Sequence, residues 1–360
     1  MLEPMSTAVS PYEAKNRIAA RVPFEDSKAE PRVSVVIPCF NEERFIGKVL
    51  ENVASQYEAE SFEIVIVDGM SEDGTRQVVS TFIEQNTHLR VRLVDNPLRH
   101  IPAALNRGIA EARGQIIVRM DAHSVPSPNY VRRCVELLEG GSAEVCGMPW
   151  RIEPGRDSLV ARAIARAVAH PFGIGDAKYR QSDLSSPQFV DTVPFGAFSK
   201  SLWSEVGGFD EGLLSNEDYD FHYRVRQRGG RILLDASGYS SYFARPTLKD
   251  LARQYFRYGR WKAEMLKSHP RSVRARQLVA PAFVLSLVCL SLLGLLWSPA
   301  LYLLLLMMAC YSSLAILFAV RLAIKGREVG LVAVIPLVFF VIHTAWGGGF
   351  LLSFLRSPRR

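Results

Sequence analysis

Three long apolar runs near the C-terminal end of this 360-residue chain set the strongest limit on its fold. Residues 278–297 and 300–320 contain no charged side chain, and each run can cross about 30 Å of hydrocarbon as a helix. Inside hydrocarbon the backbone must satisfy its hydrogen bonds within the segment, so a helix is the expected form. We therefore predict a membrane domain over residues 276–360 that contains two spans.

The third apolar run, 329–354, is interrupted by His343 and by the glycines at 347–349. Basic residues before the first span and after the second place both flanks in the cytoplasm. A third full crossing would put the C-terminal arginines outside, against that bias, so a span and a re-entrant or interfacial segment both remain open. For His343 we favour an interhelical hydrogen bond over a headgroup contact.

The polar part of the chain alternates short apolar runs with helical stretches. β-branched runs at 33–38, 64–67, 91–94 and 115–120 predict strands, and the residues at 41–56, 76–84 and 101–112 predict the helices between them. Further strands are expected at 189–200 and 231–235, and further helices at 157–169 and 217–227. This alternation predicts an α/β domain over 31–245, with a mostly parallel sheet and helices on both faces.

Two further segments complete the expected organisation. Residues 1–30 are polar, lack an apolar signal-peptide core, and are expected to form a mobile tail. Residues 246–275 contain a basic, aromatic helix at 248–266, a composition that suits the membrane interface. A solvated basic face is the alternative for that helix.

Composition excludes several classes of protein. The net charge is +7 and the pI is near 9.2, yet the densest basic stretch immediately precedes the apolar runs and no nucleic-acid-binding signature accompanies it. The five cysteines form no CxxC pair, so neither a disulfide framework nor a zinc cluster is indicated. A dinucleotide-binding dehydrogenase is disfavoured because no G-x-G-x-x-G follows the first strand, and a transporter because no acidic relay lies in the spans.

Acidic residues follow two of the predicted strands. Asp68 closes the run 64–67, and Asp121-Ala122-His123 follows the run 115–120. In parallel sheets ligands bind beyond the carboxyl ends of the strands. Side chains at i and i+2 of an extended chain point the same way, and a cation that bridges phosphates needs few protein ligands. The ordinary alternatives are an Asx turn at Asp68 and a capped turn with an exposed histidine at His123.

A third acidic signal, Glu217-Asp218, begins the predicted helix 217–227. Acidic residues in a first turn also satisfy the helix dipole, which is the structural alternative. The functional interpretation is a carboxylate general base that takes a proton from an acceptor hydroxyl.

In their order along the chain, these segments resemble the family 2 glycosyltransferases of the GT-A fold. The resemblance covers roughly residues 33–235 and rests on PCFNEE, IVIVDGMSEDGT, LNRGIAEARG, VRMDAHS and VGGFDEGLLSNEDYDFHYRVRQRG. The Asp-Ala-His triplet, QYFRYGRW and HTAWGGGF look more narrowly like the bacterial succinoglycan-type exopolysaccharide glucosyltransferases. Processive relatives carry Gln-x-x-Arg-Trp, whereas here Tyr258 follows Arg257, which favours addition of a single sugar.

The resemblance implies a role for each matching residue. Asp218 would be the catalytic base, and Asp121 and His123 would hold a divalent cation, Mn²⁺ or Mg²⁺, with the histidine favouring Mn²⁺. The donor-binding residues would be Pro38, Asn41, Glu42, Asp68, Asn106 and Asp121. The acceptor-binding residues would be Glu217, Gln254, Arg257 and Trp261. The arginine that often precedes the family's asparagine is replaced by Leu105, with Arg107 one place later.

The implied activity is metal-dependent, inverting transfer of a hexose, with glucose expected, from a UDP-sugar to a polyprenyl-diphosphate-linked acceptor. Such an enzyme would serve exopolysaccharide or cell-surface glycan synthesis as a multi-pass protein of the inner (plasma) membrane. Its catalytic domain would face the cytoplasm and contact membrane lipids, and no nucleic acid would bind. Two alternatives stay open: transfer to a polyprenyl monophosphate or other membrane lipid, and a membrane-anchored nucleotide-sugar-binding protein without turnover.

Overall fold

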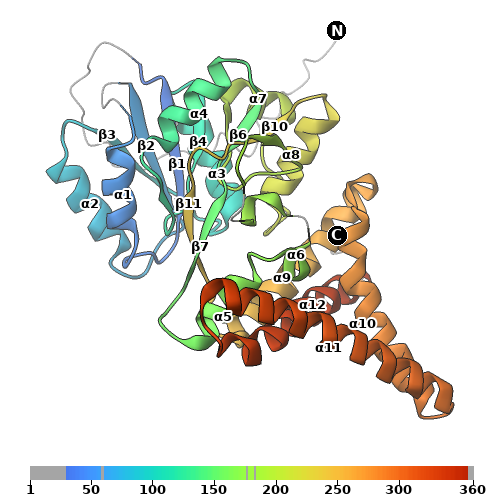
Figure 1. Cartoon of the computed structure of the whole chain (residues 1–360). Coiled ribbons are helices and arrows are strands. Elements are labelled where there is room, and N and C mark those ends of the chain that lie inside the picture. The colour runs from blue at the N-terminus through green and yellow to red at the C-terminus, as the bar shows by residue number, and fades with distance from the viewer. Residues whose placement is uncertain (1–29, 58–60, 176, 182–183, 356–360) are drawn as a thin grey trace, which may run out of the picture.

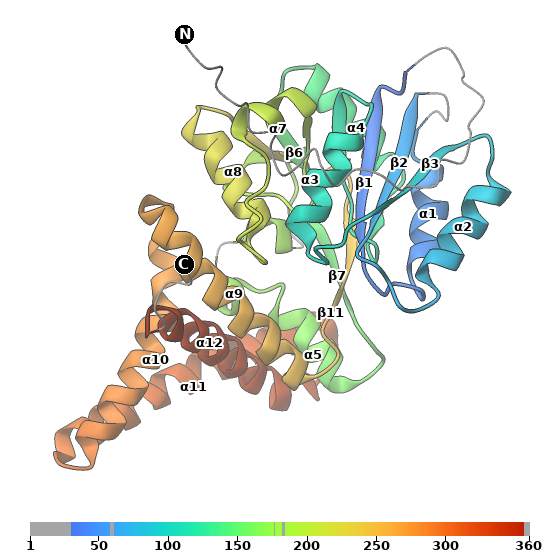
Figure 2. The same cartoon turned by 180° about the vertical axis from the view of Figure 1, so that it is seen from behind.

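The structure is a computed structural model that describes residues 30–57, 61–175, 177–181 and 184–355. The tail expected at 1–30 lies outside the described residues apart from Glu30, as do the C-terminal arginines. Figures 1 and 2 show an α/β part, which carries both β-sheets, lying beside a helical part formed by the C-terminal helices.

An eight-stranded sheet forms the centre of the α/β part, in the order β3-β2-β1-β4-β9-β6-β10-β8. Strands β1, β2, β3 and β4 pair in parallel, as do β6 and β10, whereas β9 and the edge strand β8 run antiparallel to their neighbours. The predicted mostly parallel sheet is confirmed. Its strands are β1 (Val33–Cys39), β2 (Phe62–Asp68), β3 (Arg90–Asp95), β4 (Ile116–Arg119), β6 (Val145–Gly147), β8 (Gln188–Phe189), β9 (Ala197–Ser199) and β10 (Ile232–Leu234).

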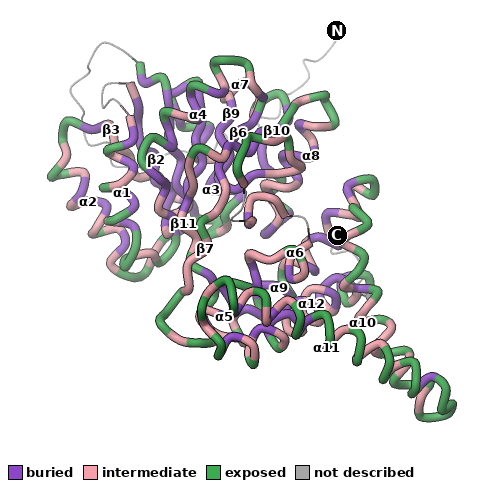
Figure 3. Tube along the Cα trace, viewed as in Figure 1, coloured by how far each residue is buried: buried purple, intermediate pink, exposed green. Residues whose placement is uncertain are grey.

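Helices cover both faces of this sheet. On one face α1 (Ile46–Ala54), α2 (Thr75–Gln85) and α4 (Tyr130–Glu139) enclose an apolar core, and on the other α3 (Ile101–Glu111), α7 (Lys200–Val206) and α8 (Glu217–Gln227) enclose a second. Because β1, β2 and β4 are buried on both faces, their sequences read as nearly continuous apolar runs. In Figure 3 the buried residues concentrate in this sheet.

Two predicted elements differ from the structure. The helix predicted at 41–56 begins only at Ile46, because Asn41 is left-handed (φ 55°) and the backbone N–H groups of Asn41 and Glu42 donate to the side chains of Ser71 and Thr75. The single strand predicted at 189–200 is wrong. Its middle is interrupted at Phe195, which has φ 49°, so only the short strands β8 and β9 remain.

A three-stranded sheet connects the α/β part to the helical part. β11 (Ser240–Ala244) lies between β5 (Val125–Pro126) and β7 (Trp150–Pro154), and β7 leads directly into α5 (Leu159–Ala167). β11 is followed by α9 (Leu248–Ser268), so the sheet and these two helices position the helical part beside the central sheet. The short helix α6 (Pro171–Ile174) follows α5.

Three helices in the described residues are long and apolar enough to cross a membrane: α10 (Ala275–Gly294), α11 (Ser298–Gly326) and α12 (Leu331–Leu355). Only 6% of the apolar window of α10 and 11% of that of α11 is buried, against 33% for α12. Figures 1 and 3 show α10 and α11 as a projecting, exposed hairpin, whereas α12 lies along α9 and α5. The third apolar run, left open above, is therefore one continuous helix.

Small residues let α9 and α12 cross with their backbones in contact. A Cβ atom at Gly259 would lie 2.0 Å from the carbonyl oxygen of Trp346, and one at Gly349 would lie 2.1 Å from that of Phe256. His343 of α12 contacts the Tyr311 hydroxyl of α11 at 2.8 Å and the Phe172 carbonyl of α6 at 2.7 Å. The interhelical role preferred for His343 is confirmed, Gly347 and Gly349 serve packing, and none of the glycines at 347–349 interrupts the helix.

Candidate active site

The catalytic cleft expected at the carboxyl ends of the strands begins with β2 and β4. Both strands pair in parallel with β1, so Asp68 at the end of β2 and Asp121 just beyond β4 lie at the same edge of the sheet. Asp68 is fully buried, whereas the side chain of Asp121 is 22% exposed. Asp121 is therefore the more accessible of the two carboxylates to a ligand in the cleft.

Arg119, the last residue of β4, joins the separate acidic signals into one cluster. Its Nη2 atom lies 3.2 Å from Asp121 Oδ1 and 3.2 Å from Glu217 Oε1, and its Nη1 atom contacts Asp218 Oδ2. Only 4% of the Arg119 side chain is exposed. Asp121 and Asp218, which are far apart in the sequence, thus share one buried counter-ion at the same cleft.

This environment changes the acid–base properties of Asp218. Burial raises its pKa, Arg119 lowers it, and the negative charges of Glu217 and Asp121 raise it further, with a net result of about 7. A carboxyl with a pKa near neutrality can exchange a proton under ordinary conditions, as a general base must. The pKa of Arg119 is above its ordinary value, because three carboxylates outweigh the opposing effect of burial.

His123 lies next to Asp121 and contacts Glu42 from the loop after β1. The distance from His123 Nδ1 to Glu42 Oε1 is 2.8 Å, and this hydrogen bond raises the pKa of His123, with burial opposing it and Asp121 adding to it. A carboxylate on Nδ1 fixes the imidazole orientation and leaves Nε2 as the available nitrogen. This pairing is the usual support of a metal-binding histidine.

The donor-binding residues expected from the sequence lie mostly in one loop cluster. Pro38 is buried in β1, and the Asn41 side chain accepts a hydrogen bond from the backbone of Glu72 (2.8 Å). The Asp68 carboxylate accepts bonds from the backbone N–H and the hydroxyl of Ser71 and from Arg76 Nη1 at 2.7 Å. A carboxylate has about four acceptor positions, so these three bonds leave one position unused on a side chain that is fully buried.

Asn106 lies outside the loop cluster that holds most of the other expected donor-binding residues. Its side-chain amide donates to the carbonyl of Phe209 (2.8 Å) and to Glu211 (2.9 Å), and its oxygen accepts from the Phe209 N–H (2.8 Å) and from Trp203 (3.2 Å). These four bonds hold the loop between α7 and α8. The structure therefore brings Asn106 together with the loop that precedes Asp218 and not with Asp121, and Leu105 beside it is buried in the core.

The residues expected to bind the acceptor lie in different surroundings in the structure. Glu217 is part of the acidic cluster, whereas Gln254 is buried in α9 and donates to the hydroxyls of Tyr242 (2.9 Å) and Tyr258 (3.0 Å). Trp261 packs in an apolar cluster with Leu213, Tyr219, Tyr223 and Met265. Arg257 is exposed on α9. One face of α9 thus contacts the catalytic side, where Asn216 also donates to the carbonyl of Tyr258 (3.3 Å).

The predicted cation is compatible with these residues. Among the described residues no three His, Cys, Asp or Glu side chains form a closed metal cluster. A nucleotide-bound Mg²⁺ or Mn²⁺ instead takes one or two protein ligands together with phosphate oxygens. An accessible Asp121 carboxylate and a His123 ring oriented by Glu42 provide that incomplete donor set.

Comparison with known proteins identifies the family. The family model described as "Glycosyl transferase family 2" matches residues 34–203. The chain is 29% identical over 332 residues to the succinoglycan biosynthesis protein ExoA of Rhizobium meliloti (strain 1021), covering 91% of this chain and 96% of that protein. It is 26% identical over 333 residues to a dolichyl N-acetyl-alpha-D-glucosaminyl phosphate 3-beta-D-2,3-diacetamido-2,3-dideoxy-beta-D-glucuronosyltransferase of Methanococcus voltae, covering 90% and 98%.

A solved structure with the same fold is the mannosyltransferase PcManGT from Pyrobaculum calidifontis, determined in complex with GDP-Man and Mn²⁺. The TM-score is 0.59 at 20% sequence identity, and the match covers 90% of each chain. This likeness establishes the fold as the GT-A type. Residues 34–203, which include Arg119 and Asp121, therefore match glycosyl transferase family 2, a class of inverting enzymes, on the GT-A fold, and three helices of the described residues that can cross a membrane follow them.

Proposed function

We propose that this glycosyltransferase moves a hexose from a UDP-sugar to a polyprenyl-diphosphate-linked acceptor in exopolysaccharide or cell-surface glycan synthesis, with glucose the first donor to test. The observation that carries the proposal is the shared contact of Arg119 with Asp121 and Asp218. The expected base, Asp218, and the expected metal-binding carboxylate, Asp121, share this partner, which supports the proposal. The relatives whose names concern succinoglycan and a dolichyl-phosphate-linked sugar support a lipid-linked acceptor.

In this proposal the reaction is one displacement at the anomeric carbon. Asp218 accepts the proton of the acceptor hydroxyl while that oxygen forms the new C–O bond, and the bond to the nucleoside diphosphate breaks on the opposite face. The sugar carbon is therefore inverted, and an α-linked donor gives a β-linked product. A divalent cation held by Asp121 and His123 would neutralise the charge that develops on the departing diphosphate. Arg119 keeps Asp218 oriented and partly charged.

The acceptor is proposed to lie at a membrane surface. The α10–α11 hairpin and α12 supply three candidate spans, and α9 lies between α12 and the catalytic side of the α/β part. Basic residues flank α10 and α11, which favours a cytoplasmic position of the catalytic domain at the inner membrane. The nucleotide sugar then enters from the cytoplasm, while the lipid-linked acceptor stays in the bilayer.

Turnover by the purified full-length protein tests the proposal. Protein in detergent is incubated with UDP-glucose, other UDP-sugars and GDP-mannose, with polyprenyl-diphosphate-linked and polyprenyl-monophosphate acceptors, and with Mn²⁺, Mg²⁺ or EDTA. The expected result is metal-dependent consumption of a UDP-hexose that requires the diphosphate-linked acceptor and gives an inverted product. Faster turnover with the polyprenyl monophosphate would favour the first alternative. Donor consumption no faster than background hydrolysis with every acceptor would overturn the proposal.

The non-catalytic alternative is tested by Asp218→Asn. Removal of a general base lowers turnover by about 10²–10⁴-fold, whereas donor binding is retained because Asp218 does not hold the nucleotide. The matched control is Asp210→Asn, an exposed aspartate in the turn before α8 whose carboxylate accepts a hydrogen bond from the Gly212 N–H. If Asp218→Asn transfers sugar as well as the control does, Asp218 is not the base.

A further inference from the structure

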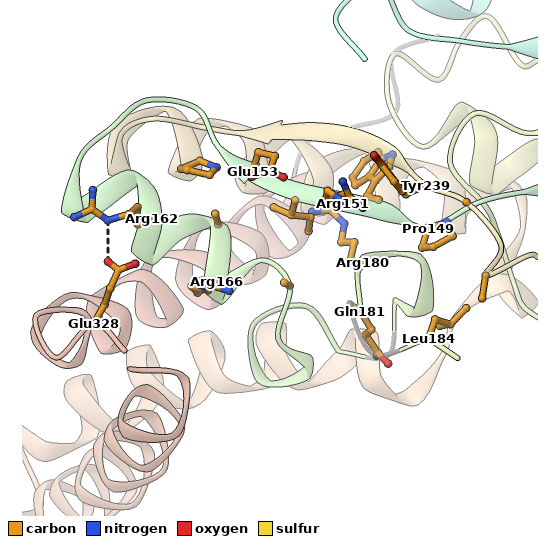
Figure 4. Close-up of a pocket in the computed structure, with 17 residues that line it drawn as sticks. Pro149, Arg151, Glu153, Arg162, Arg166, Arg180, Gln181, Leu184, Tyr239 and Glu328 are labelled. Carbon is orange, nitrogen blue, oxygen red and sulfur yellow. Dashed lines mark hydrogen bonds and ion pairs between the residues drawn. The ribbon is translucent and has the colours of Figure 1, made fainter. Parts of the chain in front are cut away.

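A polar cavity lies apart from the acidic cluster around Arg119, where the small sheet meets the helical part. Its volume is about 470 Å³, and Figure 4 shows it bordered by Arg151 of β7, by Arg180 and Leu184, and by Arg166 of α5. Four arginines line it, Arg151, Arg162, Arg166 and Arg180, against two glutamates, Glu153 and Glu328. A cavity of this size can hold a small ligand, and its lining has an excess of positive charge.

Arg180 is the unusual member of this lining. Arg180 is 6% exposed, and among the described residues no carboxylate lies within ion-pair distance of its guanidinium. Its guanidinium carbon lies 4.6 Å from the centre of the Trp150 ring and 5.6 Å from that of Tyr242, and its Nε atom donates to the Tyr179 hydroxyl at 3.4 Å. Arg180 is thus held by aromatic rings, and its guanidinium borders the cavity.

A buried charge that contacts no opposite charge is unfavourable for the fold. Buried arginines normally pair with a carboxylate, and Arg119, the other described arginine that is less than 10% exposed, does so. The aromatic rings around Arg180 fix its plane but leave N–H donors facing the cavity. A planar guanidinium presents a fork of donors that matches phosphate oxygens. The geometry therefore favours the binding of an anion in the cavity.

The position of the cavity relates that anion to the membrane. Glu328, in the turn between α11 and α12, pairs with Arg162 of α5 at 2.8 Å, and both line the cavity. Arg166, one helical turn further along α5, is exposed and lies against Gly326 at the end of α11. The cavity thus borders the ends of two candidate spans, the level at which the phosphate groups of membrane lipids lie.

A chain of aromatic contacts connects the cavity to the acidic cleft. The Trp150 ring that stacks on Arg180 lies 5.8 Å from the Phe195 ring, and the Arg119 guanidinium lies 6.0 Å from the same Phe195 ring. Arg180 and Arg119 are therefore separated by two side chains. The cavity therefore lies close to the acidic cluster that contains Asp218, with packed side chains between the two.

We infer that the cavity around Arg180 binds the phosphate groups of the membrane-lipid acceptor. This inference rests on the proposed function and adds to it a location for the lipid end of the acceptor. Arg180 and Arg166 provide the phosphate contacts, Trp150 and Tyr242 orient Arg180, and the acceptor sugar extends toward Asp218.

Kinetics of Arg180→Gln, Arg180→Lys and Arg166→Gln in full-length protein test this site. We expect the KM for the polyprenyl-diphosphate-linked acceptor to rise at least tenfold in both glutamine variants, with the KM for the UDP-sugar and the turnover number changed less than threefold. Arg180→Lys, which keeps the charge, should restore part of the loss. Arg253→Gln on the exposed surface of α9, outside the cavity, is the control and should change neither constant. Because Arg166 is exposed, its variant stays informative if Arg180→Gln does not fold.

A competition experiment distinguishes the two sources of lipid phosphate. Nanodiscs of phosphatidylcholine receive equal mole fractions of sugar-free polyprenyl diphosphate or of phosphatidylglycerol. We expect the polyprenyl diphosphate to inhibit transfer by the wild type but not by Arg180→Gln, and phosphatidylglycerol to inhibit neither. Equal inhibition by phosphatidylglycerol, or an unchanged acceptor KM in Arg166→Gln and Arg180→Gln, overturns the inference. If the wild type itself consumes no donor, the proposed function fails instead.

Discussion

Arg119 at the end of β4 forms an ion pair with Asp218 in the first turn of α8, inside a site that leaves 4% of the Arg119 side chain exposed. The same guanidinium also contacts Asp121 and Glu217. The buried Arg119 guanidinium therefore holds together three carboxylates that would otherwise repel one another. The functions proposed for Asp121 and Asp218 depend on this common partner.

Loss of Arg119 should impair both stability and catalysis. Arg119→Met leaves the three carboxylates without their buried counter-ion, and breaking such a pair costs about 3–5 kcal/mol, so the melting temperature should fall by several degrees. Arg119→Lys keeps a positive charge but cannot contact three carboxylates at once. Its pH–rate profile should shift to higher pH, because a weaker counter-ion leaves the pKa of Asp218 higher.

The control for these variants is Arg113→Met, an exposed arginine in the loop before β4. Thermal melting and pH–rate profiles of the three variants check the prediction. An Arg119→Met protein as stable as the Arg113→Met protein would show that the cluster tolerates three adjacent carboxylates.

Activity should increase with pH through neutrality. The base must be ionised to accept a proton, and the pKa of Asp218 is raised to about 7, mainly by burial. The kcat/KM value at pH 6 should therefore be about one tenth of its plateau above pH 8. The measurement uses saturating Mn²⁺ at each pH, since the raised pKa of His123 also makes metal binding pH-dependent. A flat profile from pH 5.5 to 8.5 would contradict the assignment.

The raised pKa of Asp218 also makes the stability of the fold depend on pH. A carboxyl whose folded-state pKa is raised stabilises the fold in its protonated form, and that stabilisation is lost as pH rises from the unfolded pKa through about 7. Asp218→Asn cannot ionise. The melting temperature of this variant relative to the wild type should therefore increase between pH 5 and pH 8, a difference that needs no activity to be measured.

Glu42 should affect metal affinity without being a ligand itself. It orients His123 through the 2.8 Å contact to Nδ1, and loss of such a supporting partner lowers metal affinity by about 10–100-fold. Glu42→Gln should therefore raise the Mn²⁺ concentration needed for half-maximal turnover by that factor. Glu43→Gln is a matched neighbour whose carboxylate accepts from the Gly74 N–H (3.1 Å) and should have no such effect. Equal Mn²⁺ requirements in the two variants would show that Glu42 does not support metal binding.

The crossing of α9 and α12 should be intolerant of even one methyl group. Gly259→Ala places a Cβ atom 2.0 Å from the Trp346 carbonyl oxygen, so the two helices must separate. We expect a lower melting temperature in detergent and reduced transfer to the lipid acceptor. Gly348→Ala, in the adjacent glycine run, meets no atom within 4 Å and should behave as the wild type. Identical melting curves for the two variants would refute the close contact.

Much of the fold could be predicted from the sequence, because buried parallel strands and polar helices leave clear patterns. Helix α8 has the predicted bounds 217–227, and β1, β2, β3 and β4 lie where apolar runs predicted them. The strand predicted at 189–200 failed because its apolar residues belong to a turn at Phe195 and to two short strands. Periodicity reports burial, and a buried turn resembles a buried strand.

The acidic residues of the site could be found from the sequence, but Arg119 could not be recognised by the same means. A single arginine in an apolar strand does not indicate what it faces, and its partners come from the residue after next beyond β4 and from α8. The available signal was its position two residues before Asp121, on the same side of an extended chain. Arg180 was missed for a similar reason, since its aromatic partners come from separate segments.

The backbone contact at Gly259 and Gly349 also bears on which acceptors can be used. Backbone contact at the crossing of α9 and α12 would limit bending there, so the carboxyl of Asp218, if it is the base, would be held at a fixed distance from the bilayer. Such an arrangement would select acceptors by their length. Acceptors with too few or too many sugars between lipid and hydroxyl would be rejected by length, before any individual hydroxyl is recognised.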